Sequence, residues 1–388
     1  MTAPDQHMQQ RLAEADRALA GGNLPQAREL LESLVSANPQ VPAFWHRLAT
    51  VRRMAGEPRG ALVAIDRALG IVPLDFVGLL VRAALLDQLG DGEAGEAYGR
   101  ALAQRRPDPM PPMLVPVIAR AETAWRAYQE SLENRLHGAL EHSGLTLTGE
   151  ERRRAERLAS NISRRTRIYH SEATHFHYPN LREVEYWDPA EFPWLAEVEA
   201  ATEDIAAELA IVAAAEAAER VPYVQYEANE PLAQWRSLNY NMDWTAIHLI
   251  QRGKVIEANA ALCPRTMDLM ARMPQPWIEG CGANAMFSLL APRTAIPPHG
   301  GVANTRLLCH LPLVVPGKCW FRVGDQVRDW ERGKPWVFDD SIEHEAMNET
   351  DELRVILIFD VWYPDLSPAE RAAVSTLIGA AAMPVGAL

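Results

Sequence analysis

The first hundred residues follow the apolar and polar spacing of helices, and this pattern repeats every 34 residues. In four sets of residues the members are spaced 34 positions apart. The sets are Gly22, Gly56 and Gly90; Pro39, Pro73 and Pro107; Ala15, Ala49 and Ala83; and Ala27, Ala61 and Gly95. We expect each glycine to end the first helix of a pair in a left-handed conformation, and each proline to stop the second helix. A period of this length is typical of the tetratricopeptide repeat, so residues 8–108 are predicted to form three such repeats.

Tetratricopeptide arrays usually present a concave surface to a peptide or partner protein. One interpretation is that the array helps to capture a polypeptide substrate or another partner. The other is that it only packs against the rest of the chain, or joins two copies into a homo-oligomer. The sequence shows no basic cluster of the kind that grips a terminal carboxylate, and both roles stay open.

A proline-rich stretch follows the repeats. Residues 107–116 contain five prolines, which indicates a stiff connector at a domain boundary. Helical spacing returns from Val117 to about Leu158, with a break near Ser143–Gly149. We therefore assign residues 109–164 to a linker with helices that brace the part that follows.

The pattern changes again after about residue 165. The segment Trp194–Arg220 predicts an amphipathic helix, and Ser367–Ile378 predicts another, with Ser367 as its N-cap and Pro368 in its first turn. Between these helices, short apolar runs separated by Gly, Pro and Asp are typical of strands. The expected strands are Trp244–Gln251, Ala285–Leu290, Arg306–Val315, Cys319–Val323, Lys334–Phe338 and Leu353–Trp362. This spacing favours a double-stranded β-helix, a cupin-like jelly roll, over residues 165–388, preceded by the all-α repeat domain.

The charge balance narrows the choice of partners. The chain has a net charge of −13, of which residues 1–108 carry only −1 and the remainder carries −12. An acidic C-terminal part repels phosphate backbones, so nucleic acid is not an expected partner. Residues 1–15 lack the apolar core of a signal peptide, and Glu208 and Glu216 interrupt the most alanine-rich helix, so we expect no membrane span and a cytoplasmic protein.

Three residues carry the strongest chemical signal: His299 in IPPHGG, His344 in DDSIEHEAMN and Arg354 in DELRVILIFD. Two neutral imidazoles can hold iron(II) and leave ligand positions open, and a guanidinium matches a carboxylate with two hydrogen bonds. The pattern predicts an iron(II) site at the histidines and a 2-oxoglutarate carboxylate site at the arginine. The acid that a facial triad would place two residues after the first histidine is absent, because that residue is Gly301.

A second group lies on one expected strand. Arg306, Leu308 and His310 alternate along it, so their side chains face the same side. An arginine and a histidine there would form a cationic pocket for an anionic co-substrate or substrate. The alternatives are a satisfied core histidine and an ion pair between Arg306 and Asp339 or Asp340. For the two aspartates themselves we expect a turn, because short acidic side chains bond their own backbone.

Three further histidines lie close together in the sequence at positions 170, 175 and 177. On a strand, His175 and His177 would share one face. No cysteine or acid completes a ligand set with them, so the preferred interpretation is histidines at the surface or along a substrate channel.

The run from Phe287 to Arg371 closely resembles the aspartyl/asparaginyl β-hydroxylase family. The matching segments are FSLLAPRTAIPPHGGVANTRLLCHLPLVVP and WERGKPWVFDDSIEHEAMNETDELRVILIFDVWYPDLSPAER, and a weaker match extends upstream to DPAEFPWL and to residues 244–253. The resemblance implies a jelly-roll dioxygenase that uses iron(II), oxygen and 2-oxoglutarate to hydroxylate Cβ of Asp or Asn.

The resemblance also implies roles for single residues. It assigns iron binding to His299 and His344, and 2-oxoglutarate binding to Arg354, His310 and Ser288. The family also carries glycine where the third ligand would be, so Gly301 agrees with it. Arg306 is the expected substrate-binding residue because of its place beside His310 on the strand described above. Leu308 and Ile250 stand where animal members have a basic residue and a large aromatic, which leaves the substrate open.

Three functions follow from these observations. The leading prediction is an enzyme that hydroxylates an Asp- or Asn-type side chain of a protein or peptide. A second is the same iron chemistry on a small amino-acid-like substrate. A third is a non-enzymatic interaction protein, in which the repeats are the working part and the barrel is inactive.

Overall fold

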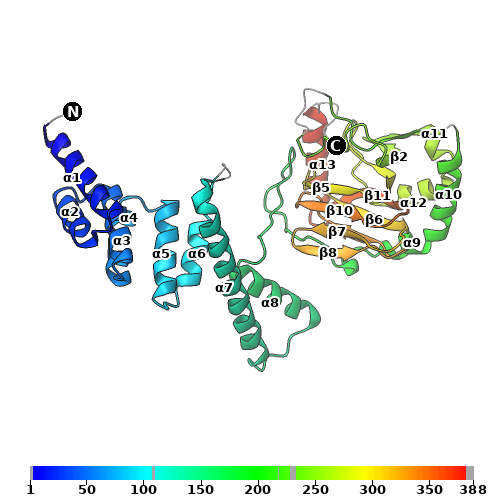
Figure 1. Cartoon of the computed structure of the whole chain (residues 1–388). Helices are drawn as coiled ribbons and strands as arrows, with labels where there is room; N and C mark the ends of the chain where they lie inside the picture. Colours follow the sequence, from blue (N-terminus) through cyan, green and yellow to red (C-terminus); the bar gives the residue numbers. More distant parts are fainter. Residues whose placement is uncertain (1–2, 107–109, 217, 228–232, 382–388) are drawn as a thin grey trace. The chain divides into compact units, whose positions relative to one another are not determined.

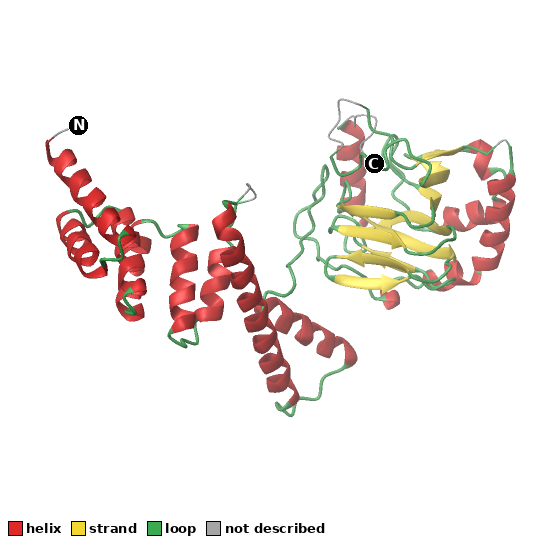
Figure 2. Cartoon of the chain, viewed as in Figure 1, coloured by secondary structure: helices red, strands yellow, loops and turns green. Residues whose placement is uncertain are grey.

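The computed structural model describes residues 3–106, 110–216, 218–227 and 233–381. Contacts divide the chain into two compact units, Met1–Thr166 and Arg167–Leu388 (Figure 1). The first unit is all helical, and the second consists of antiparallel sheets with helices (Figure 2), as the sequence predicted. Within the described ranges, no helix is both long and apolar enough to cross a membrane.

The first unit begins with three helix pairs in the predicted register. They are α1 (Ala3–Ala20) with α2 (Leu24–Ala37), α3 (Pro42–Met54) with α4 (Pro58–Ile71), and α5 (Phe76–Gln88) with α6 (Ala94–Leu102). The turn glycines of the three pairs all have a positive φ, between 67° and 77°; they are Gly22, Gly56 and Gly90. These left-handed turns are therefore confirmed. Pro39 and Pro73 follow the ends of α2 and α4 as expected, and Pro107 lies outside the described residues.

Two further helices extend this unit. After a short 3-10 turn, η1 (Pro112–Leu114), the long helix α7 (Val115–Glu141) packs on α6 so closely that a Cβ on Gly95 would overlap the ring of Tyr128. Helix α8 (Gly149–Ile162) starts at a capping box made by Thr148 and Glu151. Both helices belong to the first compact unit, whereas the sequence placed them as braces for the second.

The second unit holds two antiparallel sheets. The larger has the strand order β1-β2-β4-β11-β6-β9, with β3 also paired to β2, and the smaller has the order β5-β10-β7-β8. The bounds are β1 (Arg220–Pro222), β2 (Trp244–Gln251), β3 (Lys254–Val255), β4 (Ala285–Leu290), β5 (Ala295–His299), β6 (Arg306–Val314), β7 (Cys319–Val323), β8 (Gln326–Asp329), β9 (Trp336–Phe338), β10 (His344–Asn348) and β11 (Arg354–Trp362).

Strand alternation divides the larger sheet into two buried faces. On β11, Val355, Leu357 and Phe359 join an outer apolar cluster with the helices, whereas Ile356 and Ile358 join an inner cluster with the smaller sheet. The helices of this unit are η2 (Pro189–Glu191), α9 (Leu195–Ala200), α10 (Thr202–Ala214), α11 (Glu257–Ala260), α12 (Pro264–Arg272) and α13 (Pro368–Ala380). The space between the two sheets is therefore a closed core, and polar residues inside it require a reason.

The helix predictions for this unit were partly right. Ser367 caps α13 with a capping box, as expected. The segment Trp194–Arg220 is not one helix, because α9 and α10 end by Ala214 and Arg220 begins β1. Alanine and glutamate continue the helical pattern past this end, so the pairing of β1 with β2 decides the boundary.

Candidate active site

β5 and β10 are neighbours in the smaller sheet and bring the two predicted iron ligands together. Their register places His299 opposite His344, and the two ring centroids lie 4.0 Å apart. β5 tolerates Pro297 and Pro298 because it is an edge strand of this sheet, where one side of the backbone has no strand partner. Strand pairing alone therefore forms a two-histidine site.

Hydrogen bonds to the backbone determine how the two rings are protonated. Nδ1 of His299 lies 2.7 Å from the carbonyl oxygen of Pro297, and Nδ1 of His344 lies 3.0 Å from that of Ile342. Since a carbonyl only accepts, each Nδ1 carries the proton and leaves the Nε2 lone pair for a metal. Burial lowers the pKa of His299 to about 3 and the pKa of His344 to about 4, so both rings are neutral at pH 7, the form that binds metals.

Asp340 fills the space beside Gly301. A Cβ on Gly301 would overlap the Asp340 carboxylate, so no side chain fits at position 301. Oδ2 of Asp340 accepts a hydrogen bond from Nη1 of Arg306 (3.1 Å), whereas its buried Oδ1 has no partner among the described residues. The sequence assigned this aspartate to a turn, and only its neighbour Asp339 has that role, accepting from the backbone N–H of Ser341 (2.9 Å).

This arrangement fits a metal held by two protein ligands. Across the part of the chain that the structure describes, no three His, Cys, Asp or Glu side chains converge as a metal site. The Asp340 carboxylate nevertheless acts electrostatically on His299, so an acidic oxygen that bonds to no described residue lies near the histidine pair. An unsatisfied buried oxygen is costly unless a ligand or ordered water bonds to it.

Arg354 is a buried cation on the first residue of β11, with 1% of its surface exposed. Its Nη1 makes long hydrogen bonds of 3.3 and 3.5 Å to the carbonyl oxygen and Oγ of Ser288, and its Nε has no partner among the described residues. The guanidinium lies over the ring of Trp330, 4.6 Å from the centroid. Burial lowers the pKa of Arg354 to about 9, and no described carboxylate acts on it. This geometry suits an anionic ligand.

His310 and Ser288 lie on the same inner face as Arg354. His310 on β6 packs against Phe321 and Phe338, with ring centroids 5.0 and 4.6 Å away, and its Nδ1 has no partner among the described residues. Burial lowers the pKa of His310 well below its ordinary value, and the charge of Arg354 adds to this effect. Oγ of Ser288 accepts from the indole N–H of a tryptophan on β2 at 3.0 Å. The structure thus brings all three predicted 2-oxoglutarate residues to one face.

Arg306 is engaged by Asp340, the ion pair that the sequence left as an alternative. Its charge also contributes to the lowered pKa of His344, so it lies close to the histidine pair. Its assignment to substrate binding stays a prediction. If it does contact a substrate, it does so as part of a charge-neutral pair rather than as a free cation.

Aromatic residues beside the histidines were missed from the sequence. The ring of Trp235 lies edge-on to His299 at 4.8 Å, and Tyr223 stacks on Trp244 at 3.8 Å. The segment WRSLNYNMDW is visibly rich in aromatics, but nothing in its spacing links it to a histidine more than 50 residues later.

The predicted histidine cluster around residue 175 is not on a strand. Phe176, which lies between the exposed His175 and His177, forms a single β-bridge with Ala303 in the loop after β5. His170 pairs instead with Glu183 at 2.8 Å. The segment therefore covers the loop that follows His299, in keeping with surface histidines.

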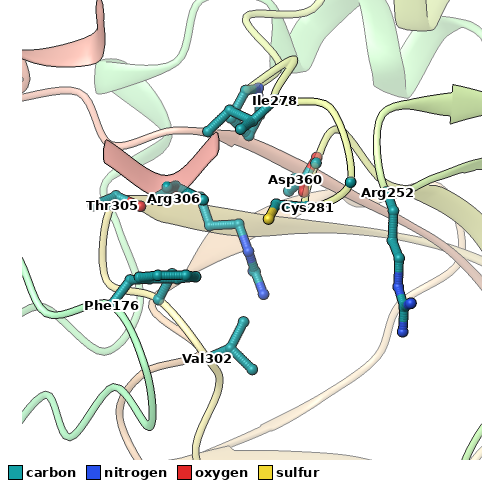
Figure 3. Close-up of a pocket in the computed structure, with 13 residues that line it drawn as sticks. Phe176, Arg252, Ile278, Cys281, Val302, Thr305, Arg306 and Asp360 are labelled. Carbon is teal, nitrogen blue, oxygen red and sulfur yellow. The ribbon is translucent and has the colours of Figure 1, made fainter. Parts of the chain in front are cut away.

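A pocket opens beside Arg306 (Figure 3). Its walls come from the loop after β5, the loop between α12 and β4, the end of β11, the segment around Phe176, and α13. Its apolar lining residues are Phe176, Pro276, Ile278, Val302, Ala303 and Ile378. Arg306 lines this pocket and also bonds Asp340, so the pocket adjoins the histidine site.

Comparison with known proteins supports the same part of the chain. The family model described as aspartyl/asparaginyl beta-hydroxylase matches residues 199–364. The human protein named aspartyl/asparaginyl beta-hydroxylase is 34% identical over 148 residues, which are 38% of this chain and 19% of that protein. Aspartate beta-hydroxylase domain-containing protein 2 of Xenopus tropicalis is 36% identical over 138 residues, 35% of this chain and 37% of that protein.

A bacterial relative matches over a longer stretch. The ornithine lipid ester-linked acyl 2-hydroxylase of Rhizobium tropici is 34% identical over 202 residues, which are 51% of this chain and 68% of that protein. The chain thus spans about a fifth of the human relative but more than two thirds of the Rhizobium one. The residues that the family model matches lie within the second unit.

Proposed function

Because this chain belongs to the aspartyl/asparaginyl β-hydroxylase family, we propose that it is an iron(II)- and 2-oxoglutarate-dependent dioxygenase. We propose further that it hydroxylates Cβ of an Asp- or Asn-type side chain in a protein or peptide. The observation that carries this proposal is Arg354, a buried guanidinium that has no carboxylate partner among the described residues and lies on the face that also holds His310. An anionic co-substrate would supply the missing counter-ion.

Each predicted residue then has a role that its contacts support. His299 and His344 would hold the metal through Nε2, because Nδ1 of each is engaged by a carbonyl. Bound iron(II) supplies the activation of oxygen that the hydroxylation needs. The unpartnered Oδ1 of Asp340 would accept a hydrogen bond from water beside the pair.

The 2-oxoglutarate site follows from hydrogen-bond capacity. Arg354 would offer its fork to the far carboxylate. Oγ of Ser288 already accepts from an indole N–H, so its own proton is free to donate to the same carboxylate. His310, kept neutral by burial, would line the path between this site and the histidine pair.

The first test is 2-oxoglutarate turnover by the full chain. The protein is loaded with iron(II) without oxygen, air is admitted, and succinate is measured for the wild type, His299→Ala and Arg354→Ala. Slow substrate-free turnover that both variants lose supports the proposal. Arg293→Ala is the matched control, because this arginine pairs with exposed Asp351 at the surface, and it should retain turnover. A wild type that binds no iron(II) overturns the assignment of the histidines.

The repeats would help to capture the polypeptide. In the helix pairs, Arg47 pairs with Asp16 and Arg82 with Asp66.

The Rhizobium relative favours a second candidate. Its name gives an acyl chain as the group that it hydroxylates, which makes a small amphiphile the alternative to a polypeptide here.

A further inference from the structure

We propose that the pocket beside Arg306 binds a large apolar side chain next to the residue that is hydroxylated, and so selects among polypeptide substrates. This inference rests on the proposed function and adds substrate selection to it.

The position of the pocket supports this role. Val302 and Ala303 line it and lie in the loop directly after His299 and Gly301. Arg306 forms another part of its wall and donates a hydrogen bond to Asp340, which fills the space beside Gly301. A substrate with its target carbon at the histidine pair therefore places neighbouring atoms at this pocket.

The lining favours an apolar group. Six of its residues are apolar, and the opposite wall is held by a small apolar cluster in which Ile278 packs with Val374 and Ile378 of α13. The buried charges are satisfied within the protein. Arg306 pairs with Asp340, and the oxygens of Asp360 accept from the backbone N–H and side-chain amide of Asn284 at 2.8 and 3.0 Å. Burial of apolar surface is then the main source of affinity here.

The size and the edges of the pocket favour a side chain over a long acyl chain. The pocket leaves about 40 Å³ for the centres of water-sized molecules, which is room for only a few waters and therefore for a short group. Arg252 and Thr305 interrupt the apolar lining. A long acyl chain needs a continuous apolar channel, whereas a side chain is flanked by polar backbone groups that suit such edges.

Arg252 adds a charge preference. It is partly exposed, and no described carboxylate forms an ion pair with it. Figure 3 shows Arg252 and Arg306 on different walls of the pocket, with their side chains extending in the same direction. Because Arg306 is neutralised by its partner, Arg252 is the cation available to a carboxylate of the substrate. A substrate in which an acidic residue is followed by a large apolar residue matches both the charge of Arg252 and the apolar lining of the pocket.

The test titrates the metal-free full chain with three acetylated peptide amides, Ala-Asp-Phe, Ala-Asp-Leu and Ala-Asp-Ser, and with decanoylglycine. We expect the Phe and Leu peptides to bind at least about tenfold more tightly than the Ser peptide, the factor that burial of one such side chain supplies. Ile378→Ala and Cys281→Phe should each reduce this preference to below about threefold, by removing a wall or by filling the space. Leu377→Ala is the matched control, since Leu377 is 70% exposed on the same helix, and it should keep the preference.

The outcomes separate this inference from the proposed function. Equal binding of the three peptides, no binding of any of them, or a preference unchanged in Cys281→Phe overturns the inference. Tighter binding of decanoylglycine than of every peptide also overturns it and assigns the pocket to an acyl chain. Absence of 2-oxoglutarate turnover after iron loading overturns the proposed function, whereas the titration of the metal-free chain still decides what the pocket binds.

Discussion

Replacing Arg354 by methionine distinguishes a cation kept for a ligand from one that holds the fold together. We predict that Arg354→Met makes the ligand-free second unit more stable and abolishes 2-oxoglutarate binding. Methionine fills irregular space in a core and carries no charge. In the ligand-free protein it would remove a buried guanidinium whose only hydrogen-bond partner among the described residues is Ser288.

The magnitude follows from the pKa of Arg354, which burial lowers from the ordinary value of arginine to about 9. The folded chain holds this proton less tightly than the unfolded chain. The charged side chain therefore destabilises the fold fully below about pH 9, and this effect fades as the pH rises toward the ordinary pKa of arginine. At about 1.4 kcal/mol per pH unit the shift corresponds to roughly 5 kcal/mol, and the contact with Trp330 offsets part of it. We expect a gain of about 1–4 kcal/mol, as for other buried ionic groups replaced by apolar ones.

The assay is thermal unfolding with and without N-oxalylglycine, an unreactive analogue of 2-oxoglutarate. A gain of this size raises Tm by about 3–12 °C for a unit of this length. The analogue at about a hundred times its Kd should stabilise the wild type by about 2.7 kcal/mol and leave Arg354→Met unchanged. A variant that melts below the wild type without ligand would refute the reasoning, because it would show that Arg354 is a structural cation.

Three further predictions concern other parts of the molecule. Gly301→Ala should weaken iron(II) binding in a metal titration by about tenfold or more, because its Cβ overlaps the neighbouring buried carboxylate; Gly300→Ala, whose Cβ meets only ordinary contacts at 3.5 Å, should bind normally. Burial lowers the pKa of His248 to about 4. Between about pH 6.5 and pH 4 this histidine is therefore protonated in the unfolded chain but neutral in the folded chain, and the free energy of unfolding falls as the pH drops through this range. Urea unfolding at neutral and mildly acidic pH should show a smaller fall for His248→Phe, and an equal fall would exclude this account. In the first unit, Gly99→Ala places a Cβ against an indole ring of α7 and should cost about 1–3 kcal/mol in thermal unfolding, whereas Gly70→Ala in α4 meets nothing and should not destabilise.

The sequence predicted the central strands of the larger sheet well and missed most edge strands, although the edge strand β9 was expected in part and the central strand β10 of the smaller sheet was not among the expected strands. β2 and β4 lie inside the larger sheet, where both faces are buried, and their apolar runs mark their bounds directly. β5 lies at an edge of the smaller sheet and contains Pro297 and Pro298, which read as a turn. The predicted iron ligand His299 was therefore identified from its sequence context, although the strand that positions it was not.

Asp340 shows where reasoning from the sequence ends. The pair of aspartates before His344 has the composition of a turn, and Asp339 does make that turn. Only the fold reveals that the next carboxylate fills the space left by Gly301, which lies 39 residues earlier in the chain. A glycine in place of an expected ligand indicates a vacancy, but the sequence cannot say which side chain occupies it.

The two arginines of the inner face, Arg354 buried and Arg306 mostly buried, complete the argument, because the fold treats them in opposite ways. Arg306 has a carboxylate partner in Asp340, so Arg306→Met would leave that carboxylate buried and unpaired, and should destabilise the unit by about 3–5 kcal/mol. Arg354 lacks such a partner among the described residues, and its replacement should stabilise the unit. Two substitutions of the same kind, both on the inner face of the larger sheet, are thus expected to change stability with opposite signs. A fold that neutralises one cation and leaves the other charged retains the second for an anion from outside the chain.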